Sequence, residues 1–271
     1  MRIQINVHGG ILIDIHSHVL PKIDDGPQSW QETMAMLYQA QEDGISEIAI
    51  THHILSNLGY EKEDEIILKY NELQDRIKNE NLKLKVHLGA EIYAQADMDL
   101  SHKISTYNDN KKYFLVEFPM QGIPKFAVDR FFEIIMEGMV PIIAHPERNA
   151  GVIRNPMRAL EFVQRGARLQ MNAGSLLGRH GSHVRDTAMI LMNSNLIHFC
   201  GSDAHNTSSR PMKLRDTLYA VAEGWGEERA RTLFKINPQK ALAGEAIIAP
   251  DPLPIQPLKT GLFGKIAKMF G

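Results

Sequence analysis

The chain has 271 residues, of which 44% are hydrophobic and 23% are charged. These proportions are ordinary for a soluble globular protein with a sizeable core, and the length allows one large domain or two small ones. The formal net charge of −2 gives no indication of a nucleic-acid partner.

Short apolar runs that alternate with helical patterns are the main feature of the chain. Seven runs predict buried strands, at residues 12–16, 47–51, 84–91, 114–118, 140–145, 168–172 and 197–202. The first helix follows a capping box at Ser29 and Glu32, and Gly44 is expected at its left-handed C-terminal cap. Further helices are predicted at residues 61–80, 125–137, 156–165, 183–194, 212–223, 227–235 and 238–243.

Strands that alternate with helices predict an α/β fold with a parallel sheet. A closed or nearly closed barrel fits the length, and a doubly wound open sheet is the alternative. In either fold, ligands bind at the carboxyl ends of the strands.

The character of the chain changes after Ala249. Four prolines between Pro250 and Pro257 predict an extended linker. The segment Leu258–Gly271 has three lysines, no acid and one apolar helical face, and it is too short to span a bilayer. It could lie in the membrane interface or dock on a partner, or it could pack on its own domain. We therefore expect a folded domain at residues 1–248 and a Pro-rich linker with a basic amphipathic tail at residues 249–271.

The compartment follows from what the chain lacks. Cys200 is the single cysteine, so an intrachain disulfide is impossible, which fits a reducing compartment. We find no secretory signal and no run of about 20 apolar residues. A cytoplasmic protein is predicted, with peripheral membrane contact through the tail as an addition to it.

Ionisable residues gather where the predicted strands end. His16 and His18 close the first strand, and because side chains alternate along a strand they point the same way and form a chelating pair. One such pair is weak support for a metal site. Six of the seven predicted strands, however, end in such residues: His16 and His18, His52 and His53, Glu91, Glu117, His145, and Asp203 and His205.

Crowded charges at one barrel mouth would repel each other unless metal ions lay between them. The sequence Asp24-Asp25-Gly26 just after the first strand either forms a turn or places a carboxylate over the same mouth. Nitrogen and oxygen donors without thiolate indicate Mn²⁺, Fe²⁺, Zn²⁺ or a mixture of them, and not a closed structural zinc site. We expect two or three divalent ions, with Mn²⁺ as the first choice and Fe²⁺ or Zn²⁺ as alternatives.

Two arginines are candidates for binding phosphate. The planar guanidinium groups of Arg148 and Arg210 match phosphate oxygens, although either residue could instead form a surface salt bridge. Cys200 lacks the arginine six positions on that cysteine-dependent phosphatases use, because Asn206 stands there. A core position is therefore predicted for Cys200.

The combined motifs resemble those of the PHP (polymerase and histidinol phosphatase) superfamily. More narrowly, they are similar to the bacterial tyrosine-protein phosphatases of capsular and exopolysaccharide operons, the CpsB/YwqE type. The resemblance runs from about Ile13 to Glu245, and it rests on Asp14-Ile15-His16-Ser17-His18, Ile23-Asp24-Asp25-Gly26, Thr51-His52-His53, Gly89-Ala90-Glu91, Val116-Glu117-Phe118, Ala144-His145-Pro146-Glu147-Arg148 and Ser202-Asp203-Ala204-His205.

This resemblance implies a distorted (β/α)7 barrel with three metal ions. His16, His18, Glu91 and Asp203 would hold the first; Glu91 would bridge to the second beside Glu117 and His145; and Asp25, His53 and His205 would hold the third. Arg148 and Arg210 match phosphate-contacting positions, and His145 and Asp203 are expected to be essential. The family usually has a residue other than His at the position of His52, so His53 is the expected ligand.

The first functional hypothesis is hydrolysis of phosphotyrosine by a metal-activated hydroxide. A tyrosine leaving group, with a pKa of about 10, needs less protonation than an alkyl alcohol. The resemblance implies a bacterial tyrosine kinase as the partner and a role in capsule or exopolysaccharide synthesis. The alternatives are a small-molecule phosphatase acting on a compound such as histidinol phosphate, and a non-catalytic regulator docked at the membrane through Leu258–Gly271.

Overall fold

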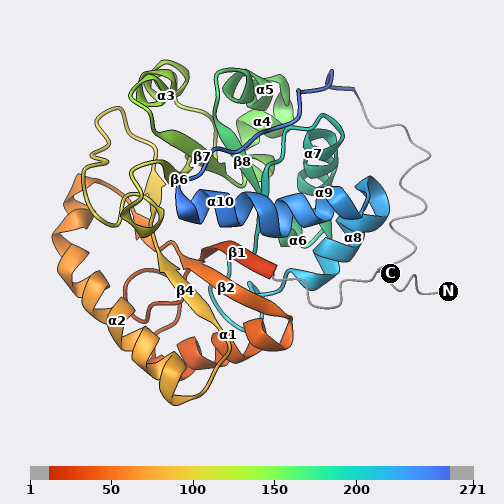
Figure 1. The fold of residues 1–271 in the computed structure, drawn as a ribbon. Coiled ribbons are helices and arrows are strands. Elements are labelled where there is room, and N and C mark those ends of the chain that lie inside the picture. Colours follow the sequence, from red (N-terminus) through yellow and green to blue (C-terminus); the bar gives the residue numbers. More distant parts are fainter. Residues whose placement is uncertain (1–11, 257–271) are drawn as a thin grey trace.

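The computed structural model describes residues 12–256, in which short parallel strands alternate with helices (Figure 1). The strands are β1 (Leu12–Ser17), β2 (Ile45–Ile50), β3 (His53–Ile54), β4 (Lys85–Leu88), β5 (Glu91–Tyr93), β6 (Tyr113–Glu117), β7 (Val140–Ala144), β8 (Arg168–Asn172) and β9 (Phe199–Gly201). The longer helices are α1 (Trp30–Glu42), α2 (Glu63–Asn79), α3 (Ala127–Met136), α5 (Met157–Gln164), α7 (Ser182–Asn193) and α8 (Arg215–Trp225). The shorter ones are α4 (Ala150–Arg154), α6 (Ala173–Leu176), α9 (Glu227–Arg231) and α10 (Asn237–Ala243).

Two sheets together form one ring of strands. Their orders are β1-β2-β4 and β3-β5-β6-β7-β8-β9. Only two residues separate β2 from β3, and β4 from β5, so each pair occupies one position in the ring. The ring closes where Ser17 bridges Ala204 and where the Asp203 N–H donates to the carbonyl of His16 over 2.8 Å. The predicted seven-position α/β barrel is confirmed, and its distortion lies in the two broken strands.

The prediction of one continuous strand at residues 84–91 is wrong, because the structure has β4 and β5 there. The strand breaks at Gly89, where an added Cβ would lie 3.0 Å from the ring of Tyr107. Backbone hydrogen bonds continue across the break, from Gly89 N–H to the carbonyl of Ile50 and from Glu91 N–H to that of His52. The chain therefore passes from one sheet to the other without losing its hydrogen-bond partners, and β5 begins with Glu91.

The first helix begins and ends close to the predicted residues. The Oγ atom of Ser29 accepts a hydrogen bond from the N–H of Glu32, and Gly44 follows the helix with φ +86°. The Glu32 carboxylate accepts from the N–H of Gln28, not from that of Ser29 as a strict capping box requires.

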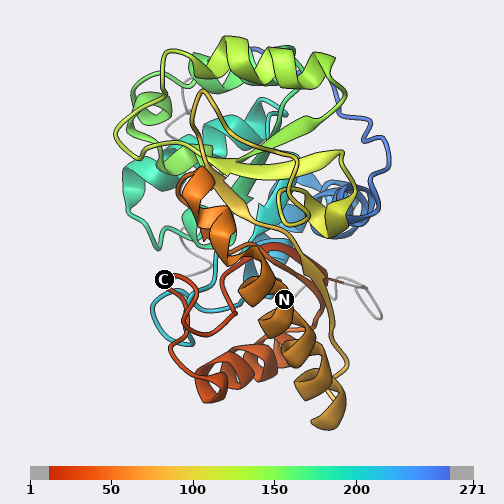
Figure 2. The ribbon, with the colours of Figure 1, turned by 90° about the vertical axis from the view of Figure 1, so that its left-hand side faces the viewer.

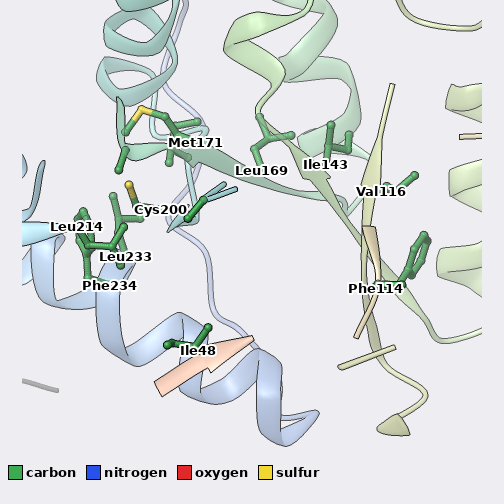
Figure 3. Close-up of a cluster of buried hydrophobic side chains, with 14 of the residues drawn as sticks. Ile48, Phe114, Val116, Ile143, Leu169, Met171, Cys200, Leu214, Leu233 and Phe234 are labelled. Atoms are coloured by element: carbon green, nitrogen blue, oxygen red, sulfur yellow. The ribbon is translucent and has the colours of Figure 1, made fainter. Parts of the chain in front are cut away.

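Apolar side chains fill both faces of the strands. An inner cluster includes Ile13, Ile15, Leu115, Ile142 and Phe199. An outer cluster between strands and helices includes Phe114, Val116, Ile143, Leu169, Met171 and the buried Cys200 (Figure 3). Strands covered on both faces are expected in a barrel of crossover units. The prediction that Cys200 belongs to the core is confirmed, and burial raises the pKa of its thiol.

Helices surround the barrel on opposite sides: α1 and α2 lie on one side and α3 and α5 on the other (Figures 1 and 2). The two C-terminal helices predicted at residues 227–235 and 238–243 form one continuous run instead, because a π-helical segment (Thr232–Ile236) joins α9 to α10 and Pro238 falls in the first turn of α10. Ala241 and Leu242 of α10 pack into the inner cluster.

The described part of the predicted linker, residues 249–256, contains neither helix nor strand. The N–H of Leu253 donates to the carbonyl of Ser194 over 2.9 Å, and Ile255 packs on the outer cluster. The predicted tail Leu258–Gly271 lies outside the described residues, and the boundary at residue 248 stays a prediction. Among residues 12–256, every helix is too short or too polar to cross a bilayer.

Candidate metal centre

All nine predicted ligands lie together at the carboxyl ends of the strands. They come from β1, β3, β5 and β6, and from the loops that follow β1, β7 and β9: His16, His18, Asp25, His53, Glu91, Glu117, His145, Asp203 and His205. Most of them are buried, whereas Asp25 is 61% exposed and marks the side open to solvent.

The first set of donors is formed by His16, His18, Glu91 and Asp203, whose ligand atoms all lie within 4.8 Å of one another. The Nε2 atoms of His16 and His18 lie 3.1 and 3.3 Å from Oε2 of Glu91. The same two nitrogens lie 3.5 and 3.7 Å from Oδ1 of Asp203. Four donors thus converge on one point.

A second set lies beside the first and shares Glu91 with it. The Nδ1 atom of His53 is 3.2 Å from Oε2 of Glu91 and 3.3 Å from Oε1 of Glu117. The Nε2 atom of His145 is 3.0 Å from the other oxygen of Glu91 and 3.9 Å from Glu117. Glu91 therefore contacts histidines of both sets.

The third set contains His18, Asp25, His53 and His205. Oδ1 of Asp25 lies 3.0 Å from Nε2 of His205 and 3.5 Å from Nε2 of His53. The structure thus assembles the predicted third group and adds His18 to it, so that neighbouring sets share side chains.

The donor atoms fit a bound cation. Oε2 of Glu91, Nδ1 of His53 and Nε2 of His205 are buried without a hydrogen-bond partner. Buried polar atoms without partners are costly, and divalent ions held within the three donor sets would satisfy them. Imidazole and carboxylate donors suit Mn²⁺, Fe²⁺ and Zn²⁺.

Protons balance the carboxylates when no metal is bound. Burial alone would lower the pKa of His18, but the hydrogen bond to Asp24 and the negative charge of Glu91 raise it to about 10. The neighbouring histidines, and Arg210 beside Asp203, hold the pKa values of Glu91 and Asp203 well below their usual range despite burial. Burial and the nearby His18 charge lower the pKa of His205 to about 3, which leaves that ring neutral.

The two adjacent histidines of the Thr51-His52-His53 motif have different surroundings. His53 contacts three carboxylates of the cluster, from Asp25, Glu91 and Glu117. His52 is 1% exposed, belongs to none of the three sets, and has no hydrogen-bond partner for either ring nitrogen among the described residues. The geometry therefore favours His53 as the ligand.

Both candidate phosphate-binding arginines reach the same carboxylate. Arg148 donates from Nη1 to Oδ2 of Asp203 over 2.8 Å, and Arg210 donates from Nη2 to Oδ1 over 2.6 Å. Their side chains are 21% and 29% exposed. A guanidinium has five N–H donors, so each retains donors for a second anion.

The sequence singled out Asp24-Asp25-Gly26 but did not predict that Asp24 supports the cluster. Asp24 accepts from Nδ1 of His18 over 2.7 Å and from the N–H of His53 over 3.1 Å. Gly26 turns this loop back so closely that an added Cβ would lie 2.8 Å from the carbonyl oxygen of His18. Gln170 and Asn172 were missed as well, because β8 is the one predicted strand that carries amides and no ionisable residue at its end.

Comparisons with known proteins agree with this geometry. The family model described as capsular polysaccharide synthesis, CpsB/CapC, matches residues 12–243. The tyrosine-protein phosphatase YwqE of Bacillus subtilis is 34% identical over 257 residues, which cover 93% of this chain and 99% of that protein. The tyrosine-protein phosphatase CpsB of Streptococcus pneumoniae is 30% identical over 244 residues, which cover 87% of this chain and 100% of that protein.

A solved structure from work on YwqE of Bacillus subtilis and CpsB of Streptococcus pneumoniae, described as unique metal-dependent tyrosine phosphatases, superimposes with a TM-score of 0.84 at 33% identity. The match covers 90% of this chain and 100% of that one. An amidohydrolase from Mycoplasma synoviae superimposes with a TM-score of 0.56 at 12% identity, over 96% of this chain and 95% of that one. This second likeness concerns the barrel fold alone.

Proposed function

The chain belongs to the CpsB/CapC family of capsular polysaccharide synthesis, and we propose that its nine clustered His, Asp and Glu side chains are the metal ligands with which it hydrolyses phosphotyrosine. The protein is a metal-dependent tyrosine-protein phosphatase. The site assignment rests on the position of Glu91, whose carboxylate contacts histidines of two adjoining donor sets.

The nine clustered side chains would hold divalent ions, which would lower the pKa of bound water toward neutrality and offset the charge of a phosphate. The chain's own residues supply the rest. Arg148 and Arg210 point their guanidinium groups at Asp203 from the solvent side, and their remaining donors hold the phosphoryl oxygens. Because a tyrosine leaving group has a pKa of about 10, its departure requires less proton transfer than that of an alkyl alcohol.

The rim of the site suits a phosphoprotein substrate. Leu55 and Leu58 follow the ligand His53 and are 62% and 73% exposed. Their loop is held in place, since the side chain of Gln95 donates to the carbonyl of Leu55 and the side chain of Asn57 bonds the backbone of Asp97 and Asp99. Fixed apolar side chains beside a phosphate site can contact residues that flank a phosphotyrosine.

Three finer assignments belong to the same proposal. The metal is Mn²⁺, with Fe²⁺ or Zn²⁺ as alternatives, because the donor set has nitrogen and oxygen and no thiolate. The substrate is a bacterial tyrosine kinase phosphorylated on tyrosine, as membership of a capsular polysaccharide family suggests. The protein acts in the cytoplasm.

The test is phosphate release by metal-stripped protein reloaded separately with Mn²⁺, Fe²⁺ or Zn²⁺. Each preparation receives a phosphotyrosine peptide, a phosphoserine peptide and histidinol phosphate. Metal-dependent release from phosphotyrosine alone supports the proposal. Preference for histidinol phosphate would overturn the substrate assignment and leave the ligands intact, and bound metal without any hydrolysis would favour a regulator.

The ligand assignment is tested by Glu91→Gln and Asp203→Asn, which should abolish turnover and reduce metal content. Glu47→Gln is the matched control, since Glu47 is another acid paired with a histidine, His87, but lies outside the three donor sets. Wild-type turnover in both ligand variants would refute the assignment.

A further inference from the structure

Gln170 lies behind the first donor set and is completely buried. Its Oε1 atom is 2.9 Å from Nδ1 of His16. The residue comes from the middle of β8, and it has no charge with which to bind a metal strongly. Its amide instead determines which nitrogen of the His16 ring carries the proton.

The surroundings fix which end of the amide faces His16. The amide nitrogen of Gln170 donates to the carbonyl of Met171 over 2.8 Å and to Oδ1 of Asn172 over 3.0 Å. Both partners are acceptors, so the NH₂ group must point toward them. The oxygen must then face His16, and it can only accept.

An acceptor opposite Nδ1 determines the state of the His16 ring. Nδ1 must carry the proton, so Nε2 keeps its lone pair when the ring is neutral. Nε2 is the atom that lies 3.1 Å from Glu91 and 3.5 Å from Asp203 in the first donor set. The lone pair therefore points at the position where a metal would bind.

The same network reaches Asp203. Asn172, whose Oδ1 is occupied by Gln170, donates from Nδ2 to Oδ2 of Asp203 over 2.7 Å. With Oδ2 held by this bond, Oδ1 of Asp203 faces the Nε2 atoms of His16 and His18. Gly201 leaves space for this arrangement, since an added Cβ would lie 2.9 Å from Cβ of His16 and 3.0 Å from the Gln170 amide nitrogen.

We propose that Gln170 is a positioning residue of the metal centre, which holds His16 in the Nδ1–H form and, through Asn172, aims Asp203 at the same ion. The inference rests on the proposed metal site. In this arrangement β8, which has no ionisable residue at its carboxyl end, sets the geometry of His16 and Asp203. Partners behind metal ligands typically change metal affinity by about 10- to 100-fold when they are removed.

The experiment measures Mn²⁺ affinity of the full chain by competition with a chelator. Gln170→Met keeps the length of the side chain and removes the acceptor, and it should weaken binding about 10- to 100-fold. Gln170→Glu can still accept from Nδ1 of His16 but loses the donor to Oδ1 of Asn172, so it should restore only part of that loss. Gln164→Met, the same exchange at an exposed position of α5, should bind like the wild type.

A second measurement does not depend on any variant. In wild-type protein loaded with diamagnetic Zn²⁺ and labelled with ¹⁵N in its histidines, His16 should show a protonated Nδ1 and an unprotonated Nε2. An unprotonated Nδ1 would overturn the inference, as would Gln170→Met protein that binds Mn²⁺ within about twofold of the wild type. Wild-type protein that binds no metal would instead refute the proposed function.

Discussion

Arg148 donates a hydrogen bond from Nη1 to Oδ2 of Asp203 over 2.8 Å, so a candidate phosphate-binding residue and a candidate metal ligand are in direct contact. We expect Arg148→Lys to lower kcat/KM for a phosphotyrosine peptide by about 10²- to 10³-fold, the range for losing one donor to a developing charge. Lysine keeps the charge but loses the planar fork. Metal content should stay at the wild-type level.

Arg154→Lys is the control for this substitution, because Arg154 is an exposed arginine at the end of α4. It should leave kcat/KM unchanged. Equal kinetics of Arg148→Lys and Arg154→Lys protein would remove Arg148 from the phosphate site.

Metal removal should lower the stability of the fold as well as activity. Glu91 Oε2 and His205 Nε2 are buried without hydrogen-bond partners, and a bound ion supplies the missing interaction. A ligand at 100 times its Kd stabilises the folded state by about 2.7 kcal/mol. Thermal unfolding with Mn²⁺ and with a chelator should therefore show a higher Tm with metal, and the difference should be smaller in Glu91→Gln protein, which keeps only the third donor set intact. A metal-dependent Tm shift in that variant as large as in the wild type would contradict the role of Glu91.

Much of this site could be predicted because it follows from a simple geometric rule. Parallel strands end at the same edge of a barrel, so His16, Glu91, Glu117, His145 and Asp203, far apart in sequence, must meet there. Alternation along β1 and the single cysteine then limit the chemistry to imidazole and carboxylate donors. The assembled site contains all nine residues that were expected.

The supporting residues could not be predicted in the same way. Gln170 and Asn172 have no charge, and glutamine or asparagine near a strand end is common in any fold. The roles of Asp24 and Asp25 depend on a turn: Asp24 bonds His18 and His53, whereas Asp25 faces His205. The break at Gly89 also depends on packing, since the Tyr107 ring that lies against it comes from a distant segment.

Metal affinity should rise with pH. The hydrogen bond to Asp24 and the charge of Glu91 outweigh burial and raise the pKa of His18 to about 10, and the charges of Glu91 and Asp203 likewise outweigh burial and raise that of His16. Below that pH these rings hold protons that a metal must displace. For each proton that the metal displaces, metal affinity rises about tenfold per pH unit, so Mn²⁺ binding should strengthen from about pH 7 to about pH 9.

Calorimetry of Mn²⁺ binding in buffers of different ionisation enthalpy would count the released protons. The same raised pKa has a consequence for the metal-free protein: the stabilisation from protonated His18 is fully present below about pH 6.5 and is lost as the pH rises through about 10. Mn²⁺ affinity that stays constant between about pH 7 and about pH 9 would contradict the raised pKa of His18, on which both expectations rest.

The apolar rim should affect protein substrates selectively. Leu58→Ser removes a side chain that is 73% exposed on the loop after the ligand His53, and it should raise KM for a phosphotyrosine protein about 10- to 100-fold, since burying a leucine side chain contributes about 1.5–3 kcal/mol. The kinetics with a small aryl phosphate should not change, because such a substrate does not extend beyond the metal centre. Leu68→Ser provides the comparison, as Leu68 is 68% exposed but lies farther along α2. If Leu58→Ser and Leu68→Ser proteins had the same KM for the phosphoprotein, the rim would have no part in substrate binding, and recognition would depend on the phosphotyrosine group alone.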